Sequence, residues 1–222
     1  MGSLRGTIGL ESEVVGIASG AEIRVTGSAA SAAIVCVNGG HANEDEGTWS
    51  ASIEWLVRRL APRFPALGFV EVRYRVMSWR RLELCVEDAR AAVRAMGAPR
   101  TLLLGYSMGG AVGITAADEP SVERVVGLAP WIPDALSLEP LRGKRLDVLQ
   151  GSLDRRLLRP GVAPAQSRRG FERAHALGIE GTYELIRGGV HGVAFRAATG
   201  RLLPLPRARA WERLVGAQLR AL

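Results

Sequence analysis

The stretch that decides the fold is Thr101-Leu102-Leu103-Leu104-Gly105-Tyr106-Ser107-Met108-Gly109, which leads into the apolar run 111–117. Residues 101–104 predict a buried strand, and 111–117 predicts a short helix that ends before Pro120. A turn this tight between strand and helix strains its central residue, so the residues two positions away must be small. Gly105 and Gly109 occupy these two positions. The pattern predicts Ser107 at the carboxyl end of a strand, with its hydroxyl above the sheet.

Short strand-like runs alternate with helical stretches on both sides of this motif. We expect strands at 14–17, 22–26, 32–37, 69–76, 101–104, 124–128, 146–149 and 183–186. We expect further helices around 53–60, 82–96, 166–177 and 211–222, with Gly97 and Gly178 as stops. Such alternation predicts an α/β class, with a mostly parallel central sheet, helices on both faces and an antiparallel pair opening it. The length of 222 residues favours a single domain over 1–222.

Composition excludes several classes of protein. The 29 basic and 22 acidic residues give a net charge of +7. The arginines come as scattered pairs with acids between them, which favours a solvated surface over a nucleic-acid partner. A weaker interpretation is a field that attracts an anionic substrate or carrier. No apolar run approaches the ~18 residues of a membrane span, so no membrane partner is expected.

Two observations bear on the compartment. Cys36 and Cys85 are the only cysteines, which leaves no disulfide framework and suits a reducing compartment. The N-terminus lacks the basic and apolar segments of a signal peptide. We therefore expect a cytoplasmic protein; the sequence does not decide its oligomeric state.

Two later segments complete a recognisable order. A predicted strand runs into Gln150-Gly151-Ser152-Leu153-Asp154, and another into Gly188-Gly189-Val190-His191-Gly192. With the Gly105–Gly109 motif, this order resembles the α/β-hydrolase superfamily over nearly the whole chain. The resemblance implies Ser107 as nucleophile, His191 as its general base and Asp154 as the acid that orients the histidine.

The alternatives for the acid and the base are few. Asp134 follows the preceding strand, where some relatives carry the acid, and it stays open as an alternative. Asp147 is expected inside its strand, which makes it a poor candidate. His175 is expected in the middle of a helix, as a surface or half-buried residue.

A tetrahedral oxyanion needs preorganised donors. The backbone N–H of Met108, directly after the nucleophile, is the first candidate. By resemblance, the second is the N–H of Gly40 in the loop Val37-Asn38-Gly39-Gly40-His41. Asn38 stands where relatives often have histidine.

The surroundings of the site depart from the family in two further places. Residues 41–46 form an acidic loop, interpreted mainly as solvated, with selection of a cationic or polar substrate, or of a metal, as the alternatives. His41 is a candidate substrate contact. The segment after Tyr74 matches no subfamily. Relatives usually insert a lid after the strand at 124–128, but only residues 129–145 intervene here. We therefore predict no cap domain and an open site bordered by Trp131.

The sequence thus predicts a cofactor-free, metal-free serine hydrolase that cleaves a carboxylic ester through an acyl-enzyme on Ser107. The same residues serve thioester cleavage, on coenzyme A or on an acyl carrier, equally well. A non-catalytic binding protein on a hydrolase scaffold is the alternative from another class, and the intact set of Ser107, Asp154 and His191 argues against it.

Overall fold

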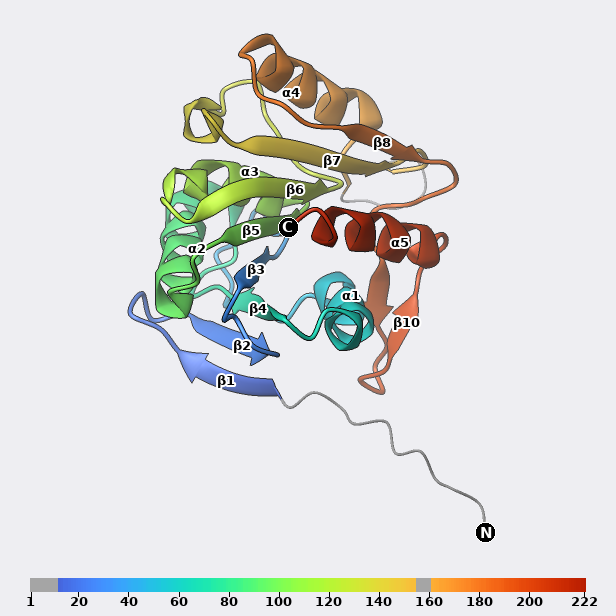
Figure 1. Ribbon diagram of the computed structural model, residues 1–222. Helices are drawn as coiled ribbons and strands as arrows, with labels where there is room; N and C mark the ends of the chain where they lie inside the picture. Colours follow the sequence, from blue (N-terminus) through green and yellow to red (C-terminus); the bar gives the residue numbers. More distant parts are fainter. Residues whose placement is uncertain (1–11, 155–160) are drawn as a thin grey trace.

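The computed structural model describes residues 12–154 and 161–222 as a layered sheet with helices on both faces (Figure 1). Its strands are β1 (Ser12–Gly16), β2 (Glu22–Thr26), β3 (Ala32–Val37), β4 (Leu67–Arg73), β5 (Thr101–Tyr106), β6 (Val122–Leu128), β7 (Arg145–Gly151), β8 (Tyr183–Ile186), β9 (Ala194–Arg196) and β10 (Leu202–Pro204). Its α-helices are α1 (Ala51–Leu60), α2 (Leu82–Met96), α3 (Met108–Thr115), α4 (Pro164–Ala176) and α5 (Ala208–Leu219). Short 3-10 turns lie at Ala61–Arg63, Trp79–Arg81, Ala116–Asp118 and Glu139–Leu141.

The main sheet has eight strands in the order β1-β2-β4-β3-β5-β6-β7-β8. The strands from β4 through β8 pair in parallel, whereas β1 with β2 and β2 with β4 are antiparallel. The predicted α/β class, with an antiparallel pair opening a mostly parallel sheet, is confirmed. Because parallel strands end at one edge, the loops after β3, β5, β7 and β8 meet there.

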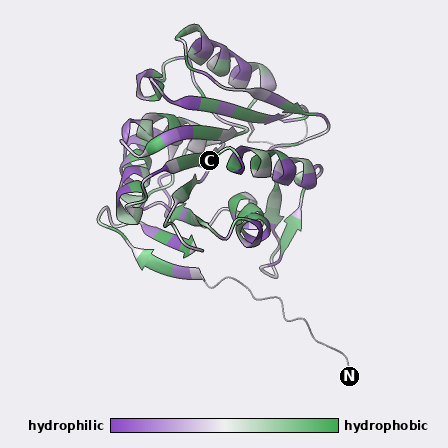
Figure 2. Cartoon of the chain, viewed as in Figure 1, coloured by the Kyte–Doolittle hydropathy of each residue, from purple (hydrophilic) through white to green (hydrophobic). Residues whose placement is uncertain are grey.

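Each central strand divides its side chains between two cores, because successive side chains point to opposite faces. Ile34 and Leu104 face α1 and α5, while Val35 and Leu103 face the layer of α2, α3 and α4. Figure 2 shows the sheet as largely hydrophobic between helices whose outer faces are hydrophilic. In the described part of the chain, no helix is both long and apolar enough to cross a bilayer.

Most predicted elements are present with their ends shifted by one to three residues, and three of the differences concern the site or the sheet. The strand predicted at 69–76 ends at Arg73, because Arg73 pairs with the first residue of β2 and no neighbouring strand continues beyond it. Helix α3 begins at Met108 rather than at 111, directly after the serine. The hairpin of β9 and β10 was not predicted, since strands of three residues leave too short a pattern to recognise.

No cap domain is inserted after β6. Residues 129–144 contain one 3-10 turn, Glu139–Leu141, before β7 begins. The capless fold predicted from the spacing of these elements is therefore confirmed, and the edge that carries Ser107 is not covered by an insertion there.

Candidate active site

Ser107 occupies the sharp turn between β5 and α3. Its backbone has φ 55° and ψ −117°, a conformation that residues other than glycine rarely adopt. The surrounding chain holds this conformation: the N–H of Ser107 donates to Leu128 O (2.9 Å), and its carbonyl accepts from Trp131 N (2.8 Å). A Cβ at Gly105 or Gly109 would overlap backbone atoms. The two glycines are thus required by space, as the motif predicted.

The structure brings Ser107, His191 and Asp154 into one hydrogen-bonded line. His191 Nε2 lies 3.0 Å from Ser107 Oγ, and His191 Nδ1 lies 2.8 Å from Asp154 Oδ2. The His191 side chain is 9% exposed and that of Asp154 is fully buried. A buried carboxylate on Nδ1 favours the tautomer in which Nε2 is free to accept a proton.

Asp154 is held by more than the histidine. Gln150 Nε2 donates to Oδ2 (2.9 Å), and the backbone N–H of Val162 donates to Oδ1 (3.1 Å). Both carboxylate oxygens are therefore satisfied in a dry environment, where an unpaired charge would be costly. Sequence reasoning did not find Gln150 or Val162, because a glutamine at a strand end carries no signal of its own.

The alternative residues lie elsewhere. Asp134 is exposed. Asp147 is buried inside β7 and accepts hydrogen bonds from the N–H and the hydroxyl of Thr182. His175 is exposed on α4 and stacks on Phe171. None of these three side chains has a hydrogen bond to Ser107 or His191 in the described part of the chain.

The two backbone N–H groups expected to bind an oxyanion are those of Met108 and Gly40. Met108 is the first residue of α3, so its N–H has no carbonyl four residues earlier within the helix. The N–H of Gly39 is engaged by Asn38 Oδ1 at 2.7 Å, which leaves Gly40 as the next donor of that loop. A Cβ on Gly40 would lie 2.5 Å from Met108 Sδ, so the two predicted donors come from segments in close contact.

A cleft of about 610 Å³ opens at Ser107. It is lined by Asn38, Gly39, Gly40, His41, Thr48, Met77, Tyr106, Ser107, His191, Ala194, Phe195 and Leu205. None of these described lining residues is Lys, Arg, Asp or Glu. The apolar part of its wall consists mainly of Met77, of Ala194 and Phe195 in β9, and of Leu205, which follows β10.

His41 and Trp131 were the two residues predicted to border the site. His41 lines the cleft; its Nδ1 is buried without a hydrogen-bond partner in the described chain, and its Nε2 lies 3.5 Å from Asp45 Oδ2. Trp131 is half-buried and packs against the core on the α2–α3 side. It is not among the cleft-lining residues, and it reaches the site through its backbone bond to Ser107.

The fold matches known structures closely over most of its length, although no protein-family model and no curated protein matches the sequence. A dienelactone hydrolase-like promiscuous phosphotriesterase, P91, from metagenomic libraries aligns with a TM-score of 0.70 over 95% of this chain and 97% of that one, at 13% identity. A putative α/β hydrolase from Agrobacterium tumefaciens, ATU1826, gives a TM-score of 0.70 over 95% of both chains, at 14% identity. Carboxyl esterase 2 from the fungus Tuber melanosporum gives 0.68 over 98% and 88%, at 14% identity.

This protein has the α/β-hydrolase fold. The recognition made from sequence order is thereby confirmed at the level of fold, which is what similarity at these identities shows.

One anchor of the candidate site escaped sequence analysis. Ser52, in the first turn of α1, accepts from Val193 N (2.9 Å) and donates to Ala194 O (3.1 Å), which ties the chain after His191 to α1. The Tyr106 ring lies 5.2 Å from the His191 ring. Burial, with the nearby charge of Asp154, raises the pKa of Tyr106 well above its usual value against a smaller opposing effect of Ser52. Tyr106 therefore stays neutral beside the histidine.

The acidic loop at 41–46 is largely neutralised by this chain's own arginines. Glu44 pairs with Arg81 at 3.2 Å, and Glu46 pairs with Arg73. Among the described residues, no three His, Cys, Asp or Glu side chains are grouped so that they could hold a metal ion.

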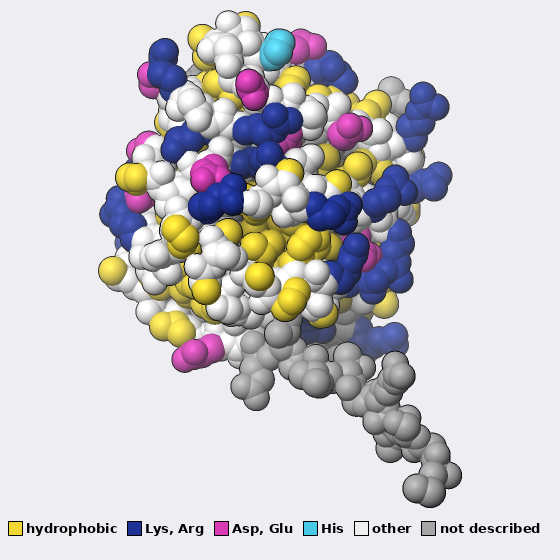
Figure 3. Space-filling model, viewed as in Figure 1, with side chains coloured by type: hydrophobic (Ala, Val, Ile, Leu, Met, Phe, Trp, Pro, Cys, Tyr) yellow, Lys and Arg dark blue, Asp and Glu magenta, His cyan; other side chains and the backbone are white. Residues whose placement is uncertain are grey.

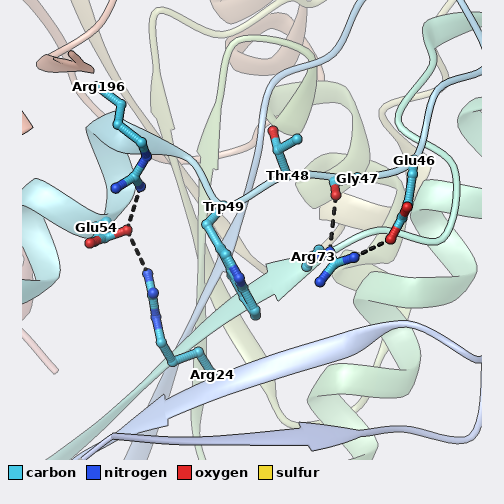
Figure 4. Close-up of a pocket in the computed structure, with 8 residues that line it drawn as sticks. All are labelled: Arg24, Glu46, Gly47, Thr48, Trp49, Glu54, Arg73 and Arg196. Carbon is cyan, nitrogen blue, oxygen red and sulfur yellow. Dashed lines mark hydrogen bonds and ion pairs between the residues drawn. The ribbon is translucent and has the colours of Figure 1, made fainter. Parts of the chain in front are cut away.

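A second cavity of about 530 Å³ adjoins the cleft through the shared residue Thr48 (Figure 4). It is lined by Arg24, Glu46, Gly47, Thr48, Trp49, Glu54, Arg73 and Arg196. Its arginines are bonded to carboxylates: Arg24 to Glu54 and Glu71, Arg73 to Glu22 and Glu46, and Arg196 to Glu54. The cavity wall is polar and close to charge balance.

Proposed function

We propose that this protein is a serine hydrolase that cleaves a carboxylic ester through an acyl-enzyme on Ser107. The observation that carries the proposal is the line from Ser107 Oγ to His191 Nε2 (3.0 Å) and from His191 Nδ1 to Asp154 Oδ2 (2.8 Å). A serine hydroxyl becomes an effective nucleophile when a base removes its proton in the transition state, and the geometry supports that transfer.

In the first half-reaction, Ser107 Oγ attacks the carbonyl carbon while His191 Nε2 takes the hydroxyl proton. The negative oxygen of the tetrahedral intermediate accepts hydrogen bonds from the N–H groups of Met108 and Gly40. His191 then gives its proton to the departing alkoxide, which leaves as an alcohol. Asp154 stabilises the imidazolium while it exists.

In the second half-reaction, a water attacks the acyl-enzyme and gives its proton to His191. The collapse of the second intermediate breaks the bond to Ser107 Oγ, which recovers its proton from the histidine. The carboxylic acid leaves. The cleft wall, with His41, Met77 and Phe195, would contact the acyl chain and the leaving group.

Thioester cleavage is the second candidate, and the charge distribution described in the next subsection favours it. The same residues would act on a thiolate leaving group. A non-catalytic binder would usually not preserve a buried acid, a histidine and a serine within hydrogen-bond distance of one another.

The test is the intact mass of the protein after treatment with a fluorophosphonate probe. We expect one adduct on the wild type, none on Ser107→Ala, and one on Ser31→Ala, a serine whose hydroxyl bonds to Ala66 O far from the site. Folded wild type without an adduct would contradict the proposal and leave the binding protein as the interpretation. Ester and thioester forms are then separated by kcat/KM on one acyl group with the two leaving groups.

A further inference from the structure

The positive charge of this chain is concentrated in one layer of the fold. This layer consists of α1 with its 3-10 extension, residues 51–63, and of the segment that follows β8 through α5, residues 187–222. It holds ten of the 29 basic residues and two of the 22 acidic ones. The rest of the chain has nineteen basic and twenty acidic residues. The net charge of +7 therefore originates in this layer.

Both acids of the layer are buried, and each gathers three guanidinium groups. Glu54 on α1 pairs with Arg24 (3.0 Å), Arg58 (2.5 Å) and Arg196 (2.6 Å), as Figure 4 shows for Arg24 and Arg196. Its side chain is 4% exposed. Arg24 is shared with the buried carboxylate of Glu71 (2.7 Å), so three arginines surround two carboxylates and one positive charge remains in excess.

Glu212 on α5 repeats the arrangement. Its side chain is 8% exposed and pairs with Arg59 (2.6 Å), Arg63 (3.1 Å) and Arg209 (3.1 Å). A guanidinium has five N–H donors, and bonds to one carboxylate use only some of them. The two buried acids therefore position arginines whose remaining donors can face solvent.

The arginines themselves are on the surface. Side-chain exposure is 68% for Arg58 and 71% for Arg209, and five more exposed arginines have no ion pair in the described part of the chain. These five are Arg187, Arg201, Arg207, Arg213 and Arg220. Figure 3 shows dark blue side chains gathered over the side where α5 and β10 lie in Figure 1, with few acidic atoms among them. We call the arginines of 51–63 and 187–222 the basic face.

The basic face lies beside the cleft rather than inside it. The hairpin that contributes Ala194 and Phe195 to the cleft continues into Arg196, and Leu205 lies two residues before Arg207. Among the residues that the structure describes, no arginine or lysine lines the cleft. A group that enters the cleft therefore meets no cationic side chain of these residues, while the part of the substrate that stays outside lies beside many arginines.

The extent of the basic face indicates the kind of partner. Arg209 and Arg220 are eleven residues apart on one helix, a rise of roughly 16 Å. A single phosphate-bearing small molecule cannot engage arginines spread along that length and across α1 as well. The adjoining cavity has no excess of positive charge, because its three arginines pair with four carboxylates, those of Glu22, Glu46, Glu54 and Glu71. Phe195 is the only large hydrophobic side chain strongly exposed in the described part of this layer, whereas helices that lie on membranes present several.

We propose that the basic face docks an acidic protein that carries the acyl group to Ser107 as a thioester. The proposal rests on the thioester form of the proposed function. The carrier's acidic surface would cover arginines on α1 and α5, while its acylated arm would pass the hairpin beside Phe195 and place the thioester carbonyl at Ser107. Docking of this kind raises the association rate and falls with ionic strength.

The experiment compares three octanoyl thioesters, on an acidic acyl carrier protein, on coenzyme A and on N-acetylcysteamine, at 50 and 500 mM NaCl. The test variant is Arg58→Gln/Arg209→Gln/Arg213→Gln, which leaves two arginines on each buried glutamate. The matched control is Arg94→Gln/Arg142→Gln/Arg169→Gln, three exposed arginines outside the basic face. Unfolding curves establish that both variants fold.

We expect kcat/KM on the carrier thioester to exceed that on the N-acetylcysteamine thioester, and to fall about tenfold in the test variant and in high salt. The N-acetylcysteamine rate and the control variant should change by less than twofold. Equal loss in the test and control variants, or equal rates on coenzyme A and the carrier, would overturn docking of a protein. Inhibition by duplex DNA as strong as by the unacylated carrier would assign the face to unspecific polyanion binding instead.

Failure of the proposed function gives a different result. If none of the three thioesters is hydrolysed, the proposed reaction is wrong, and the result does not test docking. Binding of the octanoyl carrier to Ser107→Ala, measured by titration at both salt concentrations, then tests the face alone. Binding that weakens in high salt and in the test variant supports it, and no detectable binding overturns it.

Discussion

Gln150 Nε2 lies 2.9 Å from Asp154 Oδ2, the same oxygen that lies 2.8 Å from His191 Nδ1. The glutamine is fully buried at the end of β7, and its Nε2 also approaches the carbonyl of Val162 (3.2 Å). The carboxylate that orients the histidine is therefore itself oriented by an amide from the rigid sheet. Shells of this kind hold a catalytic group in its productive geometry.

Replacing that amide should impair the reaction more than substrate binding. In Gln150→Leu, Asp154 keeps the Val162 N–H but loses a donor to the oxygen that faces His191. We expect kcat to fall about tenfold, because a hydrogen bond to a charged group contributes roughly 1.5–3 kcal/mol. KM should change by less than twofold. Gln150→Glu, which places a second carboxylate beside Asp154, should lose more; a change in KM alone would contradict this role.

The choice between two aspartates is the sharpest test of the acid. Asp154→Asn should lower kcat about 10³- to 10⁴-fold, because an amide stabilises the wrong histidine tautomer. Asp134→Asn should leave kcat within twofold, since Asp134 is exposed and has no hydrogen bond to His191 in the described chain. Steady-state kinetics on one ester substrate measures both. Similar losses in the two variants would reject Asp154 as the orienting acid.

The order of strand, turn and helix made the fold and the central residues predictable. Gly105 and Gly109 lie where a Cβ would strike backbone, so the pattern around Ser107 reflects a steric requirement that can be read directly from sequence. Asp154 and His191 each follow a strand that the sequence pattern predicted, at 146–149 and 183–186. Each of these patterns involves residues close together in sequence, and the structure contains the element that each pattern predicted.

The surroundings of the site could not be predicted in the same way. Gln150, Ser52 and Tyr106 act through contacts between segments far apart in sequence, such as the 141 residues between Ser52 and Val193. The β9–β10 hairpin is too short to leave a pattern. The basic face was read as scattered surface charge, because its arginines gather only when α1 and α5 pack side by side.

The proposed second oxyanion donor, the N–H of Gly40, is a backbone group, so its role is tested by changing the space around it. A Cβ on Gly40 would lie 2.5 Å from Sδ and 2.6 Å from Cε of Met108, the end of a flexible side chain. We expect Gly40→Ala to lower kcat about tenfold, a partial loss of one such donor. In Gly40→Ala/Met108→Ala the obstruction is removed and the N–H remains, so kcat should return to within about threefold of Met108→Ala. A double variant as slow as Gly40→Ala would contradict this placement.

Phe195 should determine the preference for acyl chain length. Its side chain lines the cleft and is 47% exposed. Removing an apolar contact of this size costs about 1–2 kcal/mol for a substrate that buries it. We expect Phe195→Ala to raise KM for an octanoyl ester five- to tenfold and to leave the acetyl ester unchanged. Leu185→Ala, which removes a 46% exposed side chain on β8, is the control. Equal effects on both esters would remove Phe195 from the acyl site.

The buried thiol of Cys85 should make stability fall in alkaline solution. Burial raises the pKa of this thiol from 9.0 to about 11, against an opposing interaction with the backbone of Ser78. Between these values the unfolded chain has released the proton and the native state retains it. Because the unfolded state then binds fewer protons, the free energy of unfolding decreases as pH rises, by up to about 1.4 kcal/mol per pH unit from this group. Below pH 9 the contribution is fully present. Urea unfolding at pH 8.5, 9.5 and 10.5 should therefore give a steeper decline for the wild type than for Cys85→Ala, and parallel declines would show that the thiol does not titrate differently in the two states.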